Sequence, residues 1–210
     1  MQKPLARYLI FGLIAASPST ALAQDQRHET YAALAPTKIA GKQLFELKTC
    51  SKCHTLAAKN EGKRTPVRKM REPDWFSAHV KEHSDIVLRK ETNRRKRRRV
   101  FREELTALKA FLFETSEQER KTIDNMPRRL FEGAYLVYQN RCLRCHTIAG
   151  TGKDIGPDLS DVGKKHDKAW FIANLKDPKQ FAPDTQMPSF SDLPQESLEK
   201  IAEYLLSLKK

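Results

Sequence analysis

The sequence contains few cysteines, few glycines and few acidic residues. Four cysteines in 210 residues are too few for a fold built on disulfides, and eight glycines exclude a collagen-like repeat. A mean hydropathy of −0.66, with no long apolar run after residue 16, argues against an integral membrane protein. Because 39% of the residues are apolar, the chain is not wholly disordered. It is a basic polypeptide, with a net charge of +13 and room for one or two small domains.

The first 23 residues predict a secretory signal peptide. Lys3 and Arg7 form a basic start, residues 8–16 are apolar, and small residues lead up to Ala23. The alternative is an uncleaved anchor, but the apolar run is only about half of the roughly 20 residues that span a bilayer. We expect cleavage before Gln24, no transmembrane segment in the mature protein, and a location outside the cytoplasm, either periplasmic or secreted.

All four cysteines lie in two copies of one motif. The copies are Cys50-Ser-Lys-Cys53-His54 and Cys142-Leu-Arg-Cys145-His146. This is the signature of covalent haem attachment, in which two thiols on one turn bind the haem vinyl groups and the adjacent His binds the iron. The alternatives are a zinc site, which needs clustered cysteine pairs, and a redox dithiol, which does not require the following His. The sequence therefore predicts two covalently attached haem c groups, with His54 and His146 as proximal iron ligands.

The two motifs belong to an internal repeat. Gly41 and Gly133 each precede the first motif cysteine by nine residues, and residues 75–82 match residues 170–177. Each half ends in an amphipathic stretch at helical spacing, and no strand pattern competes with the helices. We predict an all-α fold with two tandem haem domains, at 24–115 and 127–210, joined by a linker at 116–126.

The second half resembles a class I cytochrome c over nearly the whole of 127–210. The resemblance is carried by Gly133, Cys142, Cys145, His146, Gly156-Pro157-Asp158-Leu159, Trp170, Leu175, Met187-Pro188 and Tyr204-Leu205. It implies that the Pro157 carbonyl accepts a hydrogen bond from His146 and that Met187 is the sixth iron ligand. It also implies that Tyr204 packs on Gly133. Both domains are expected to resemble this family in fold.

The first half departs from this pattern at the sixth ligand. Its segment near residues 89–100, which matches the Met187 loop, contains neither Met nor Pro. The candidates are His83, His79 and Met70, and a vacant or lysine-bound iron is the remaining alternative. Met70 lies before the first Trp-led helix and is expected to pack rather than ligate.

Helical periodicity favours His83 among these candidates. Val80 aligns with Leu175, which the resemblance places toward the haem. Residues three or four apart share a helix face, so His83 should face the haem while His79 is rotated about 100° away. The alternative that both histidines are solvated stays open, and His28 and His166 are expected to be ordinary surface residues.

The first half also holds a basic run from Arg94 to Arg99. Residues 24–125 carry 24 basic and 15 acidic side chains, against 13 and 11 in residues 126–210. Export argues against nucleic acid as the partner. The run is expected in the distal loop of the first haem, as a docking surface for an acidic redox protein or an anionic membrane face. The alternative is a solvated stretch leading into a helix at Phe101.

The resulting interpretation is a periplasmic di-haem cytochrome that carries single electrons between redox partners. No residue is predicted to be catalytic, because the haems would carry the chemistry. A first haem with two histidine ligands would have a lower potential than the His/Met second haem, so electrons should rest on the second. The alternative is a di-haem enzyme, peroxidase-like or oxidising sulfur compounds, with a reactive first haem.

Overall fold

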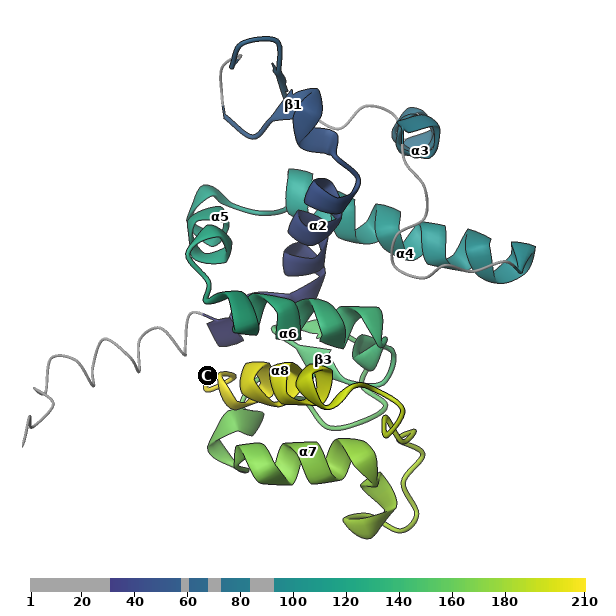
Figure 1. Ribbon diagram of the computed structural model, residues 1–210, viewed down its shortest axis with the longest axis vertical. Coiled ribbons are helices and arrows are strands. Elements are labelled where there is room, and N and C mark those ends of the chain that lie inside the picture. The colour runs from purple at the N-terminus through teal and green to yellow at the C-terminus, as the bar shows by residue number, and fades with distance from the viewer. Residues whose placement is uncertain (1–30, 58–60, 68–72, 84–92) are drawn as a thin grey trace, which may run out of the picture.

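The computed structural model describes residues 31–57, 61–67, 73–83 and 93–210 (Figure 1). Within these ranges the chain forms seven α-helices, four short 3-10 helices and four two-residue strands, which confirms the predicted helical class. The predicted signal peptide at 1–23 lies outside the described residues. In the ranges that the structure describes, no helix is both long and apolar enough to cross a membrane.

In the first half, helix α2 (Pro36–Leu47) crosses helix α4 (Arg94–Phe113) at a glycine. A Cβ atom on Gly41 would lie 2.1 Å from the carbonyl oxygen of Ala107 and 2.5 Å from the Cβ of Phe111. Only glycine therefore allows these two helix backbones to approach this closely. Buried apolar side chains of both helices form the core around the crossing.

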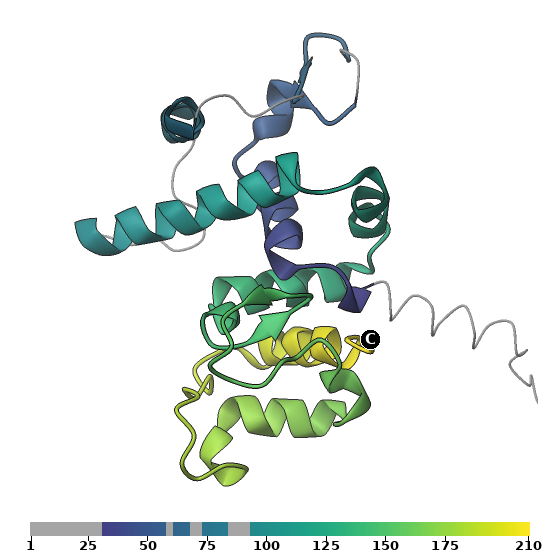
Figure 2. The same cartoon turned by 180° about the vertical axis from the view of Figure 1, so that it is seen from behind.

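The second half repeats this crossing with helices α6 (Arg128–Gln139) and α8 (Gln195–Leu206). A Cβ atom on Gly133 would lie 2.1 Å from the carbonyl oxygen of Lys200 and 2.8 Å from the Cβ of Tyr204. The expected packing of Tyr204 on Gly133 is thus confirmed. Figures 1 and 2 show α6, α8 and α7 as successive layers below α2.

In each half, a 3-10 turn within the motif, two short strands and a Trp-containing helix come in the same order along the chain. The first half has η1 (Cys50–Lys52), β1 (His54–Thr55), β2 (Thr65–Pro66) and α3 (Pro73–His83). The second half has η2 (Cys142–Arg144), β3 (Thr147–Ile148), β4 (Thr151–Gly152), η3 (Val162–Lys164), α7 (Lys168–Lys176) and η4 (Pro178–Gln180). The strand pairing differs, because β1 and β2 are parallel whereas β3 and β4 form an antiparallel hairpin.

The predicted linker contains helix α5 (Glu117–Asp124), which the sequence interpretation did not anticipate. Ser116 and Glu119 form a capping box at its start, and this Ser-x-x-Glu pattern was the available sequence signal. Ile123 and Met126 are buried, and Glu119 pairs with Lys38 at 2.6 Å. The segment is therefore packed onto the first half.

The two halves contact each other through α2, α4 and α6. Helix α2 packs directly on α6, and the Tyr138 hydroxyl donates to the Glu103 carbonyl at 2.7 Å. The Arg141 guanidinium binds the Glu103 carboxylate at 2.9 Å. Since Arg141 directly precedes the second motif, this contact ties α4 of the first half to the motif of the second.

Candidate haem-attachment sites

The second motif forms a single tight turn. Arg141 adopts the left-handed conformation, with φ of 62°. The amides of Cys145 and His146 then both donate to the Cys142 carbonyl, at 3.1 and 2.9 Å. This turn gathers both thiols and the imidazole, as thioether attachment requires. Burial raises the pKa of Cys142 to about 12, so its side chain is a neutral thiol at pH 7.

The imidazole of His146 is oriented by the loop that follows. Its Nδ1 lies 2.8 Å from the carbonyl oxygen of Pro157, as the sequence resemblance implies. Because a carbonyl can only accept, Nδ1 carries the proton and Nε2 is left with a lone pair for a metal. A Cβ atom on Gly156 would lie 2.8 Å from the His146 ring, so glycine allows the loop to reach the imidazole.

The loop that carries Met187 is attached to the end of α7. The Phe190 amide donates to the Leu175 carbonyl at 2.8 Å, and the Ser189 hydroxyl donates to the Lys176 carbonyl at 2.6 Å. The Met187 side chain is half-buried against the core, and Leu175 is buried. Ligation of iron by Met187 stays a prediction.

The first motif folds into the same turn as the second. Thr49 is left-handed, with φ of 56°, at the position that corresponds to Arg141. The Cys53 amide donates to the Cys50 carbonyl at 3.1 Å, and burial raises the pKa of the Cys50 thiol. All four cysteines are free thiols.

The imidazole of His54 has a different partner from that of His146. Its Nδ1 lies 3.3 Å from the Thr65 hydroxyl, whose position is fixed by the Thr65 amide donating to the Cys53 carbonyl at 2.9 Å. The Pro157 carbonyl that faces His146 in the second half thus corresponds to a threonine hydroxyl in the first half. The cause is the parallel pairing of β1 and β2, which places Thr65 opposite His54.

The structure brings the His79 ring next to the His54 ring. The centres of the two rings are 5.8 Å apart and their planes make an angle of 69°. The His79 ring also stacks on Trp75 at 4.8 Å. Helical periodicity predicts that His79 is rotated away from this site, and the contact with His54 differs from that expectation. The side chain of His83 and the whole of Met70 lie outside the described residues, so their roles stay predictions.

The Trp-led helix of the second half has a corresponding stacked pair that the sequence interpretation missed. His166 stacks on Trp170 with ring centres 3.5 Å apart, and is half-buried. The expectation that His166 is an ordinary surface residue is therefore wrong. His28 lies outside the described residues.

The basic run from Arg94 to Arg99 forms the first turns of α4 rather than a loop. Asn93 caps the helix by accepting hydrogen bonds from two amides, at 3.0 and 3.1 Å, so the helix begins seven residues before Phe101. All six side chains of the run are exposed. Figures 1 and 2 show this end of α4 projecting beyond α2.

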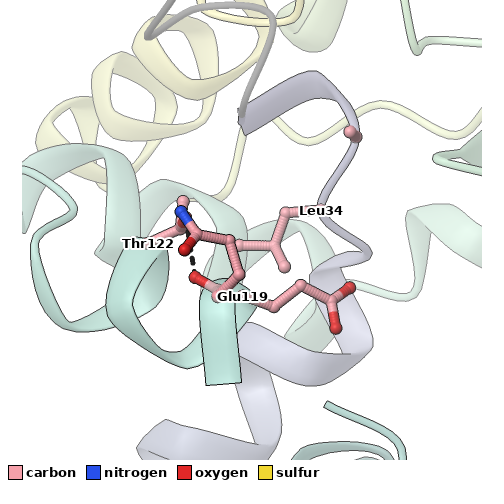
Figure 3. A pocket seen from close by; sticks show the side chains of 5 residues that line it. Leu34, Glu119 and Thr122 are labelled. Carbon is pink, nitrogen blue, oxygen red and sulfur yellow. Dashed lines mark hydrogen bonds between the residues drawn. The ribbon is translucent and has the colours of Figure 1, made fainter. Parts of the chain in front are cut away.

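A shallow pocket lies elsewhere, between the segment before α2 and helix α5 (Figure 3). It is lined by Ala33, Leu34, Gln118, Glu119 and Thr122. None of the predicted haem ligands lines it. The pocket is therefore separate from the two candidate sites.

Two comparisons with known proteins found a cytochrome c oxidase subunit. The family model described as Cytochrome C oxidase, cbb3-type, subunit III, matches residues 131–205. Cytochrome c oxidase subunit 2 of Alkalihalophilus pseudofirmus is 30% identical over 101 residues, which are 44% of this chain and 28% of that protein. The chain thus spans less than a third of this relative. No solved structure matches the chain.

The donor set of the second half fits covalent haem. Residues 131–205 are similar to a cytochrome c domain, and such a domain implies haem c. The two free thiols and the oriented imidazole lie on one turn, and a thioether Met lies in a loop held against α7. These are the groups that attach and ligate a c-type haem. The first half presents the same turn with two thiols and a histidine.

Proposed function

We propose that this chain is an exported di-haem c-type cytochrome that carries single electrons between redox partners. One observation carries the proposal. In both Cys-x-x-Cys-His motifs, the residue before the first cysteine is in the left-handed conformation and a tight turn joins the two cysteines. The repeated glycine crossings support two tandem haem domains. The similarity of residues 131–205 to a cbb3-type cytochrome c subunit supports electron transfer as the role.

In the second domain, Cys142 and Cys145 would attach the haem, with His146 and Met187 as iron ligands. When bound, the haem supplies an iron that accepts and releases one electron. The Pro157 carbonyl keeps the His146 ring in one tautomer and increases the basicity of its free nitrogen. The bonds from Phe190 and Ser189 to the end of α7 hold the Met187 loop in place.

In the first domain, Cys50 and Cys53 would attach the haem and His54 would be the proximal ligand. A second histidine completes the set in this proposal, since imidazole is a good iron ligand. Thioether ligation raises the potential relative to imidazole, so electrons would pass from the first haem to the second.

The exposed run from Arg94 to Arg99 is the proposed docking surface for an acidic redox protein. Six adjacent cationic side chains on one helix end create a local positive field, which accelerates encounter with a negative partner at low salt. Replacing Arg97, Arg98 and Arg99 by Gln should lower the rate of electron exchange with an acidic cytochrome at low ionic strength and leave it unchanged in high salt. Binding to anionic vesicles instead would assign the surface to a membrane.

The haem count tests the proposal directly. The full chain is produced in a bacterium that attaches haem c to exported proteins, and haem per chain is measured from the pyridine haemochrome and the intact mass. We expect two haems in the periplasmic protein. The paired variant Cys50→Ala/Cys53→Ala should lose one, and Cys142→Ala/Cys145→Ala should lose the other. A wild-type chain with one haem contradicts the proposal.

A further inference from the structure

Helix α3 places a histidine ring beside the histidine of the first motif. The rings of His54 and His79 are 5.8 Å apart between centres. A metal–imidazole bond is about 2 Å, so two imidazoles on opposite sides of one iron have ring centres about 6 Å apart. The planes of two such rings both contain the metal–nitrogen axis, so an angle of 69° between them is compatible with shared ligation.

The position of His79 is determined by the packing of α3. Phe76 and Val80 are buried, and the Phe76 ring meets the Phe113 ring of α4 edge-on at 5.6 Å. His79 lies three residues after Phe76 and four after Trp75, so these side chains are neighbours on the helix surface. Stacking on Trp75 at 4.8 Å then orients the His79 ring.

The two halves differ in where a sixth ligand can come from. In the second half, 18 residues (177–194) separate α7 from α8 and include Met187. In the first half, only ten residues (84–93) separate α3 from α4, and none of them is Met or His. Asn174 occupies the position of His79 when Leu175 is aligned with Val80. The first half thus offers a histidine on its helix where the second offers a methionine on a loop.

We infer that His79 is the sixth ligand of the first haem iron. The inference rests on the proposed function, because it requires a haem on Cys50 and Cys53. It assigns the ligand to the residue that helical periodicity disfavoured, and it gives the first iron two imidazole nitrogens. His54 retains its Thr65 hydrogen bond on the proximal side.

The test is low-temperature electron paramagnetic resonance of the oxidised full-length protein during a potentiometric titration. In the wild type we expect two low-spin ferric signals with different potentials. His79→Ala should convert the lower-potential signal to a high-spin one, and added imidazole should restore it. His79→Met should keep that iron low-spin and raise its potential.

Two further variants sharpen the result. Asn174→Ala changes the corresponding position of the second half and should leave both signals unchanged. His83→Ala should also leave the first signal low-spin. If His83→Ala gives the high-spin signal, or if His79→Ala leaves the lower-potential signal intact, the assignment is overturned while the di-haem proposal stands. A wild-type chain with one haem overturns both.

Discussion

The two halves cross their helices in the same way but place their ionic groups differently. Each crossing is made possible by a glycine, Gly41 or Gly133. In the first half, the ion pair between Lys48 and Glu104 joins the end of α2 to α4 with both side chains 0% exposed. In the second half, Glu203 binds its cations at the protein surface. The same helix crossing is thus accompanied by a fully buried ion pair in the first half and by surface ion pairs in the second.

Breaking the buried pair should have the largest effect. Lys48→Met leaves the Glu104 carboxylate buried without its cation, which costs about 3–5 kcal/mol of unfolding free energy. Burial and then the charge of Glu104 raise the pKa of Tyr135, and burial, Glu103 and then Glu104 raise the pKa of Tyr138, so the charge of Glu104 acts on α6 of the second half. Urea unfolding followed by far-ultraviolet circular dichroism measures the loss.

Two controls separate burial from charge in that measurement. Lys42→Met removes a cation that pairs with Glu46 and Asp124, two carboxylates that are both exposed, and should cost less than about 1 kcal/mol. The double variant Lys48→Met/Glu104→Leu removes both buried charges and should recover most of the lost stability. A loss for Lys48→Met no larger than that for Lys42→Met would show that the pair is not effectively buried.

The glycine crossings should respond equally in both halves. Gly41→Ala and Gly133→Ala each place a methyl group 2.1 Å from a backbone carbonyl oxygen, so helices must separate, at a cost of about 1–3 kcal/mol. Gly62→Ala meets no atom within 4 Å and pays only for its positive φ, about 1 kcal/mol. Thermal unfolding of the three variants gives the comparison. Equal losses at all three positions would contradict a role for close helix approach.

Part of the fold and of the second site was predictable from the sequence. The order of elements around both motifs was expected from residue patterns. The contact of Tyr204 with Gly133 and the bond from His146 to the Pro157 carbonyl were expected from the resemblance to class I cytochrome c, and both are found.

Features that depend on how elements pack were missed. Which face of α3 meets the first motif depends on Phe76 packing on Phe113, a contact between residues 37 positions apart. Helical periodicity therefore did not anticipate that the His79 ring lies beside His54. The Thr65 partner of His54 depends on strand register. The early start of α4 had a signal in the sequence, the Asn93 cap, which the dense positive charge that follows it obscured.

In the proposed di-haem protein, removing the Thr65 hydroxyl should change the potential of the first haem only. A hydrogen bond accepted from Nδ1 makes the imidazole more basic and favours the ferric state. Thr65→Val should therefore raise the first potential, by up to about 60 mV if the full value of one hydrogen bond is lost. The second haem is the internal control, because its His146 binds a backbone carbonyl. Spectroelectrochemical titration measures both, and equal shifts would contradict a local effect.

Removing the surface ion pairs of the second half should have the smallest effect on stability, and the effect should be visible mainly in how stability depends on pH. Hydrogen bonds and charge from Arg129 and then Lys168 lower the pKa of Glu203 to about 2. Because the folded pKa is depressed, the stabilisation is complete above the unfolded value of about 4.3 and is lost as pH falls toward 2. Solvent screening limits this stabilisation to less than about 1 kcal/mol.

Glu203→Gln should thus be slightly less stable than the wild type at pH 7 and equal to it near pH 2, when unfolding is measured at both values. A difference that persists at pH 2 would mean that the Glu203 side chain stabilises the α6–α8 crossing through packing rather than through its charge. The two halves would then differ in how the side chains at their crossings pack, and not only in how they place charges.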